Sequence, residues 1–209
     1  MLASHSRRKY SLRSGRVSAT SPRSLRTITE PNPGGWCSPP RYRRGVTEDH
    51  PAESVWDYPR PPRVEPSSER VEIELAGVVV ASTDRSWRVL ETSHPPTYYL
   101  PREAFAAGVL RPVAGHTWCE WKGQASYLDL VVRDPSGADR VAARAAWTYP
   151  TPTAGFEAIA GAVAVMPALV DRCTVDGEVV VPQPGGFYGG WITRRVTGPF
   201  KGGPGTTGW

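Results

Sequence analysis

Cysteine is scarce in this chain of 209 residues, and long apolar runs are absent. The three cysteines, Cys37, Cys119 and Cys173, form no C-x-x-C pair, which argues against a disulfide framework and against a cysteine-rich zinc site. We therefore expect a reducing, cytoplasmic location. The most apolar stretch, residues 158–170, is interrupted by Pro167 and falls short of the roughly 20 residues that a membrane-spanning helix needs, so we expect no membrane segment.

Acidic residues are nearly missing from the first part of the chain. Residues 1–45 carry ten Lys/Arg and one acid, whereas residues 46–209 carry fifteen Lys/Arg and nineteen Asp/Glu. The basic character therefore belongs to an arm, and the mildly acidic body argues against specific nucleic-acid binding. Because the arm is rich in Arg, Ser and Pro without apolar periodicity, we predict that it is disordered. We also hypothesise that the natural protein starts at Val46, where the composition changes, with an authentic basic arm as the alternative.

The composition divides the rest of the chain into three parts. Residues 46–69 are Pro-rich and predict an extended lead-in rather than helix or regular strand. Residues 70–183 carry the patterns of a folded domain. Residues 184–209 are rich in glycine and aromatic residues and predict an irregular strap. The strap contains a G-x-G-x-x-G match, but no strand precedes it and no helix follows, so we predict no nucleotide cofactor.

Short runs of alternating apolar and polar residues dominate the folded part. "VEIEL" at 71–75 has the period of a half-buried strand, and the turns "AG" and "TD" suggest consecutive antiparallel hairpins with "VVVAS" and "SWRVLET". "TWCEW", "ASYLDLVV" and "RVAARAAWTY" also read as strands, whereas "SHPPTYYLP" at 93–101 predicts a Pro-broken loop. Short helices are predicted in "PREAFAAG" and "AGFEAIAG". These elements predict a mainly β fold, a compact antiparallel domain with two short helices.

Three segments together resemble a known family. "TSHPPTYYLP", "TWCEWKGQASY" and "AAWTYPTPTAGFEAIAGAVAV" are similar to the bacterial domain family DUF427, and the resemblance covers about residues 70–172. It implies a two-sheet fold of the Mss4-like or β-tent class. Many β-tent proteins hold zinc between two C-x-x-C knuckles, which this chain lacks, and no D-x-D pair for magnesium occurs either. We therefore predict neither a metal nor a cofactor.

The segment "HTWCEWKGQASY" at 116–127 allows several interpretations. A nucleophilic Cys119 would need a base, but on a strand His116 and Lys122 point to the face opposite the sulfur, which leaves His94 as a distant candidate. A metal site of His94, His116 and Cys119 is a weak pattern. Burial of Cys119 as a small apolar side chain is the simplest alternative.

The aromatic residues support a different hypothesis. Strand alternation places several rings on one face, where they could line an apolar pocket or cage a cation, or simply fill the core. We predict an uncharacterised small-ligand-binding module, with Lys122 orienting an anionic or carbonyl group and a groove formed by Tyr98, Trp121, Tyr127, Trp147 and Tyr149. The alternatives are an enzyme using Cys119, Lys122 or His94 at the same groove, and a protein-interaction domain with the strap as contact surface.

Overall fold

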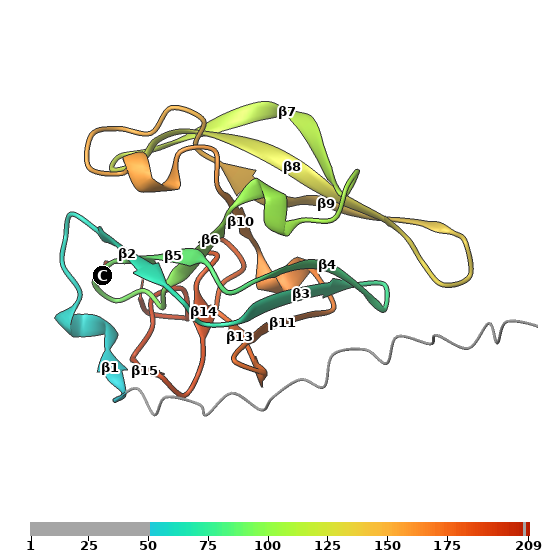
Figure 1. The fold of residues 1–209 in the computed structure, drawn as a ribbon. Coiled ribbons are helices and arrows are strands. Elements are labelled where there is room, and N and C mark those ends of the chain that lie inside the picture. The colour runs from blue at the N-terminus through green and yellow to red at the C-terminus, as the bar shows by residue number, and fades with distance from the viewer. Residues whose placement is uncertain (1–50, 207) are drawn as a thin grey trace, which may run out of the picture. The chain divides into compact units, whose positions relative to one another are not determined.

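Two antiparallel sheets hold most of the strand residues of the computed structural model, which describes residues 51–206 and 208–209 (Figure 1). The arm predicted to be disordered, residues 1–45, and the start proposed at Val46 lie outside the described residues. The structure confirms a mainly β fold.

The larger sheet has seven strands. In spatial order they are β2 (Arg63–Ser67), β5 (Ser86–Leu90), β6 (Thr97–Leu100), β10 (Val163–Val165), β9 (Asp139–Thr148), β8 (Gly123–Arg133) and β7 (Leu110–Cys119). All neighbouring strands in it are antiparallel.

The smaller sheet has four strands. In spatial order they are β12 (Glu178–Val179), β11 (Arg172–Val175), β3 (Val71–Leu75) and β4 (Val78–Thr83). The alternation in "VEIEL" is confirmed, since Val71, Ile73 and Leu75 are buried and the two glutamates between them are half-buried.

Four short strands and four 3-10 helices complete the described chain. β1 (Glu53–Ser54) pairs with β15 (Val196–Thr197) in parallel, and β13 (Val181–Pro182) pairs with β14 (Trp191–Ile192). The helices, each of three residues, are η1 (Val55–Asp57), η2 (Arg102–Ala104), η3 (Glu157–Ile159) and η4 (Pro167–Leu169). The two helices predicted from sequence therefore appear as single turns, η2 and η3.

Two expectations about strand pairing are wrong. The "TD" turn does not close a hairpin, because β4 belongs to the smaller sheet while β5 pairs with β2 and β6 in the larger one. Residues 63–67 of the lead-in form a regular strand, β2, despite Pro66. β2 lies at the edge of its sheet, where the amide that proline lacks needs no ladder partner.

The two sheets pack against each other through one apolar core. It combines side chains from β3, β4 and β11 with side chains from β6, β8, β9 and β10, among them Ile73, Tyr98, Leu130 and Val163. The opposite face of the larger sheet carries a second cluster, which includes Val89, Tyr99, Tyr149 and Ala164. Adjacent residues such as Tyr98 and Tyr99 fall in different clusters because strand side chains alternate between faces.

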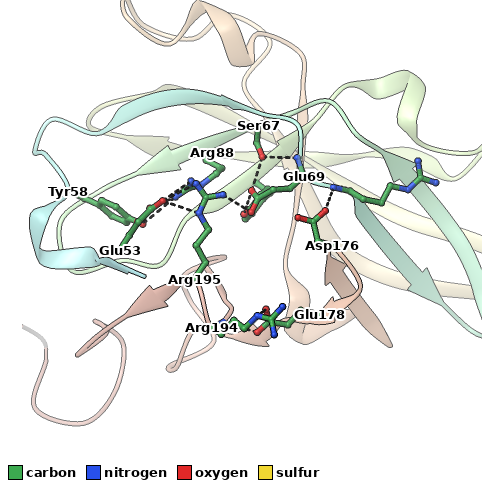
Figure 2. A network of polar contacts seen from close by, with 11 residues as sticks. Glu53, Tyr58, Ser67, Glu69, Arg88, Asp176, Glu178, Arg194 and Arg195 are labelled. Carbon is green, nitrogen blue, oxygen red and sulfur yellow. Dashed lines mark hydrogen bonds and ion pairs between the residues drawn. The ribbon is translucent and has the colours of Figure 1, made fainter. Parts of the chain in front are cut away.

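A polar network ties the lead-in and the strap to the larger sheet (Figure 2). The guanidinium of Arg88, only 2% exposed, pairs with Glu53 at 2.5 Å, and the Tyr58 hydroxyl donates to the same carboxylate. Arg195 of the strap bridges Glu53 at 2.9 Å and Glu69 at 2.6 Å. Both flanking segments are thus held by buried charge as well as by apolar contacts.

Candidate functional site

A line of rings crosses the larger sheet on its second face. Strand register pairs Trp87 with Tyr99, Tyr99 with Ala164, Ala164 with Trp147, and Trp147 with Tyr127. Because directly paired residues of antiparallel strands share a face, these side chains form one row over β5, β6, β10, β9 and β8. We call Trp87, Tyr99, Trp147 and Tyr127 the aromatic row.

Within the row Tyr99 is buried, and the other three rings are partly exposed. The Trp147 indole donates to the Tyr99 hydroxyl at 3.2 Å, and their ring centroids lie 6.4 Å apart. Tyr149 adjoins Tyr99 at 6.3 Å on the same face. Burial raises the pKa of Tyr99 and of Tyr149, so both phenols are neutral at physiological pH. Trp87, Tyr127 and Trp147 keep part of their surface in solvent.

The turn between β7 and β8 closes one end of this face. Trp121 packs against the second cluster, and its indole N–H is buried without a hydrogen-bond partner among the described residues. Thr153 holds the turn by donating its hydroxyl to the Trp121 carbonyl and its amide to the Lys122 carbonyl. The Lys122 ammonium lies 5.9 Å from the centre of the Tyr149 ring. A cation and an unpaired donor therefore border the rings at this end.

Both strands that flank β8 are bulged, β7 opposite Ser126 and Tyr127 and β9 opposite Asp129. In β7, residues 114 and 115 are extra between the partners of Ser126 and Tyr127. In β9, residues 143–145 stand opposite Asp129 alone. Bulges of this kind re-aim side chains, often beside functional sites.

The β9 bulge aims Arg144 across the middle strand. Its backbone adopts φ +50°, and its amide donates to the buried Asp129 carboxylate at 2.8 Å. Its guanidinium carbon lies 4.0 Å from the centre of the Tyr127 ring, and Nη1 donates to the Ala114 carbonyl of β7 at 2.9 Å. Asp129 also accepts from Arg111 at 2.8 Å, and the amide of Arg144 and the Arg111 guanidinium lower the pKa of its carboxyl.

Comparison with known families agrees with the resemblance read from the sequence. The model of the domain of unknown function DUF427 matches residues 63–176, more than half of the chain. The chain belongs to the DUF427 family. No curated protein matches it. The matched range includes the whole aromatic row, Arg144 and the Trp121–Lys122 turn.

The part of the DUF427 chain that the structure describes lacks a metal-binding group and a membrane-spanning helix. In that part, no group of three or more His, Cys, Asp or Glu side chains is placed to hold a metal ion. None of its helices is long and apolar enough to span a membrane.

Five of the six predicted ligand-binding residues lie at this face of the DUF427 domain. They are Trp121, Lys122, Tyr127, Trp147 and Tyr149. Tyr98 does not join them: it is 2% exposed in the core between the sheets, stacks on Trp191 at 5.1 Å and donates to Glu69 at 2.8 Å. The segment 97–100 is a strand rather than a loop, so Tyr99 takes the place expected for Tyr98.

The candidate catalytic residues are not assembled around one reacting atom. Cys119 lies beside the Tyr149 phenol, and its proximity helps, after burial and Tyr99, to raise the pKa of that phenol. His94 contacts the Thr92 carbonyl at 2.9 Å and packs on Tyr188 of the strap at 4.8 Å; burial lowers its pKa. His116 contacts Ser126 at 3.2 Å. The base expected for Cys119 is therefore engaged elsewhere.

The strap is built into the DUF427 domain. Trp191 is fully buried and donates to the Val165 carbonyl at 3.1 Å. Gly189 packs so closely on Trp147 that a Cβ there would lie 2.2 Å from the indole ring. Phe187, at the strap's turn, is 80% exposed. The strap thus both supports one ring of the row and presents an aromatic side chain outward.

Proposed function

We propose that this DUF427 protein binds a small molecule with a flat, apolar body on the aromatic row. The strand register supports this proposal most, because it aligns four rings across five neighbouring strands. Three of these rings are partly exposed to solvent. When another flat group covers ring surface that is exposed to solvent, the free energy of the complex is lowered. Ligand sites in proteins typically combine such surface with a few polar groups.

The polar groups for this ligand come from the β7–β8 turn. The indole N–H of Trp121 is buried without a partner among the described residues, and an unmet buried donor costs about 1–3 kcal/mol, which a ligand acceptor recovers where the turn moves to expose it. Lys122, at the rim over Tyr149, is the group that we propose to orient an anionic or carbonyl function of the ligand. Lysine is rare in this chain, with only Lys201 as a second example after residue 45.

A reaction at the same surface is the second candidate function. The position of Cys119 beside Tyr149 favours it, because the thiol borders the face on which the ligand is proposed to lie. Binding is the first candidate because His94, the base left for Cys119, has other partners. We propose a cytoplasmic location for either function, since cysteines without pairing motifs suit a reducing compartment.

A thermal-shift screen against a panel of metabolites tests the binding proposal. A binding metabolite raises the melting temperature in a concentration-dependent way. Trp121→Ala and Tyr127→Leu should abolish that shift while keeping the circular dichroism spectrum of the parent protein. Trp118→Ala is the matched control, because Trp118 is 73% exposed and pairs with Gln124 on the opposite face of the hairpin. A shift that survives both site variants contradicts the proposal.

A further inference from the structure

The two ring faces at the ends of the site are already covered by cations. Arg144 stacks on Tyr127 with its guanidinium carbon 4.0 Å from the ring centre. Lys122 lies 5.9 Å from the centre of Tyr149. A cationic ligand needs open aromatic faces, and here it would meet like charge at both rings. The arrangement therefore disfavours a cation cage, one of the two uses that the ring pattern allows.

Arg144 is held in place by three contacts from its two neighbouring strands, β8 and β7. Asp129 of β8 accepts its backbone amide at 2.8 Å, Ala114 of β7 accepts from Nη1 at 2.9 Å, and Tyr127 supports the guanidinium plane. Gly115 lies next to the Nη1 end, where a Cβ would approach to 3.4 Å. A guanidinium fixed in this way loses little freedom when it binds a ligand, which favours affinity.

The fixed guanidinium still has donors to offer. Of the three guanidinium nitrogens of Arg144, only Nη1 has a hydrogen-bond partner among the described residues, and the side chain is exposed. The neighbouring carboxylate does not compete for it, since the two oxygens of Asp129 are taken by the Arg144 amide and by Arg111. Nε and Nη2 therefore form an open edge with the spacing that binds carboxylates and phosphates in a bidentate manner.

We infer that the ligand of the aromatic row carries an anionic group, a carboxylate or a phosphate, and that Arg144 binds it. This inference rests on the proposed function. The flat body of the ligand covers Trp147 beside Tyr127, and its anion meets the Nε/Nη2 edge of Arg144. Sequence-based reasoning assigned the anionic end to Lys122; the contacts of Arg144 make it the better-positioned cation at the row.

Four indole probes that differ in charge test this inference. Indole-3-acetate and 3-indolyl phosphate are anionic, indole-3-acetamide is neutral, and tryptamine is cationic. Titrations followed by 1H–15N NMR should give both anions a Kd at least ~10-fold lower than that of the amide, as a charged hydrogen-bonded pair implies. Tryptamine should bind weakest. The tighter of the two anions distinguishes a carboxylate site from a phosphate site.

Variants assign the charge preference to its residue. Arg144→Met should remove the ~10-fold preference, so that the anionic probes and the amide bind this variant with similar affinity. Arg144→Lys should retain part of it, because the charge stays but the planar fork is lost. Arg140→Met is the matched control, since Arg140 is an exposed arginine of the same strand that pairs with Asp134 at 2.8 Å.

The possible outcomes separate the inference from the function on which it rests. Equal affinity for all probes, tightest binding of tryptamine, or an anion preference that survives Arg144→Met overturns the inference and leaves the binding function standing. Loss of the preference in Lys122→Ala but not in Arg144→Met also overturns it, in favour of Lys122. If none of the four probes binds, the proposed function itself fails.

Discussion

At the scale of single residues, the two cysteines that the structure describes differ in solvent access. Cys173 is 2% exposed in the core between the sheets, and burial raises its pKa to about 12. Cys119 is only partly buried, at the edge of the second cluster. Because the thiolate is the reactive form, the two should respond very differently to an alkylating reagent.

We expect iodoacetamide to modify Cys119 in the native protein and Cys173 only after unfolding. At pH 8 a thiol with a pKa of about 12 is ionised to a fraction of only ~10⁻⁴, before its lack of access is counted. Peptide mass spectrometry over a time course distinguishes the two sites, and Cys119→Ser serves as control. Equal rates at both sites would contradict the burial of Cys173. A native Cys119 rate above that of an unfolded thiol would instead favour the enzyme alternative.

At the scale of secondary-structure elements, the paired bulges around β8 build the site. Asp129 is the residue that links them, since it accepts the amide of Arg144 in the β9 bulge and pairs with Arg111 of β7. It does not contact the proposed ligand, so we regard it as a positioning residue. Its buried carboxylate accepts the backbone amide of Arg144. Arg144 adopts a left-handed conformation, which is unfavourable for any residue other than glycine.

Asp129→Ala should destabilise the domain by about 2 kcal/mol and Asp129→Asn by about 1 kcal/mol, because the amide side chain keeps one acceptor but loses the charge. Urea unfolding measures both. Asp139→Asn is the matched control: Asp139 lies on the neighbouring strand β9 in an exposed pair with Arg133, so we expect an effect below ~0.5 kcal/mol.

The Asp129 variants should also weaken the preference for anionic probes, which a purely stabilising role would not change. If the Asp129→Asn variant remains folded and binds indole-3-acetate as tightly as the parent protein, Arg144 keeps its position without the carboxylate.

Elements were predictable from sequence where periodicity decided them, and wrong where packing did. "VEIEL" gave β3 correctly, because alternate burial is a local pattern. The prediction that β5 pairs with β4 was wrong, because a two-residue turn does not specify which sheet the next strand joins. Tyr98 was assigned to the site and Tyr99 was not, because a loop was expected where β6 begins and a one-residue change of register exchanges the faces.

Arg144 was missed although the sequence contains a signal for it. In a regular strand it would share the face of Ala142 and Ala146, both of which pack in the core between the sheets. A charged arginine side chain on that face would be buried in the core without a partner. The bulge in β9 avoids this, because it turns Arg144 away from the core. The partner of the bulge, Asp129, stood out in the sequence only as an isolated acid in "YLDLVV".

At the scale of the whole molecule, the network in Figure 2 connects segments that are distant in sequence. Glu53 comes from the lead-in, Arg88 from strand β5 of the larger sheet and Arg195 from the strap. Burial alone would raise the pKa of Glu53, but hydrogen bonds from Arg88 and Tyr58 and the charges of Arg88 and Arg195 outweigh it and lower the pKa to about 2. The closure of the fold therefore depends on the ionised carboxylate.

This dependence predicts acid sensitivity. In the unfolded chain the pKa of Glu53 returns to about 4.5, so its contribution to stability is complete above pH ~4.5 and is lost as the pH falls toward 2. The shift corresponds to at most about 3 kcal/mol. We expect the free energy of unfolding, from urea titrations at pH 7, 4.5 and 3, to fall mainly below pH 4.5.

Glu53→Gln isolates this contribution. The variant should be about 2 kcal/mol less stable at pH 7, because it leaves the buried Arg88 without its ion partner while Glu53 itself is partly solvated, and its stability should vary less between pH 7 and pH 3 than that of the parent. Glu65→Gln is the control, since Glu65 pairs with Arg63 at the surface, where the side chains are 36% and 56% exposed, and its removal should shift the curve by less than ~0.5 kcal/mol. Parallel pH curves for Glu53→Gln and the parent would show that the closure of the lead-in and strap does not depend on this carboxylate, and that the apolar contacts of Val55, Leu90 and Val196 hold them instead.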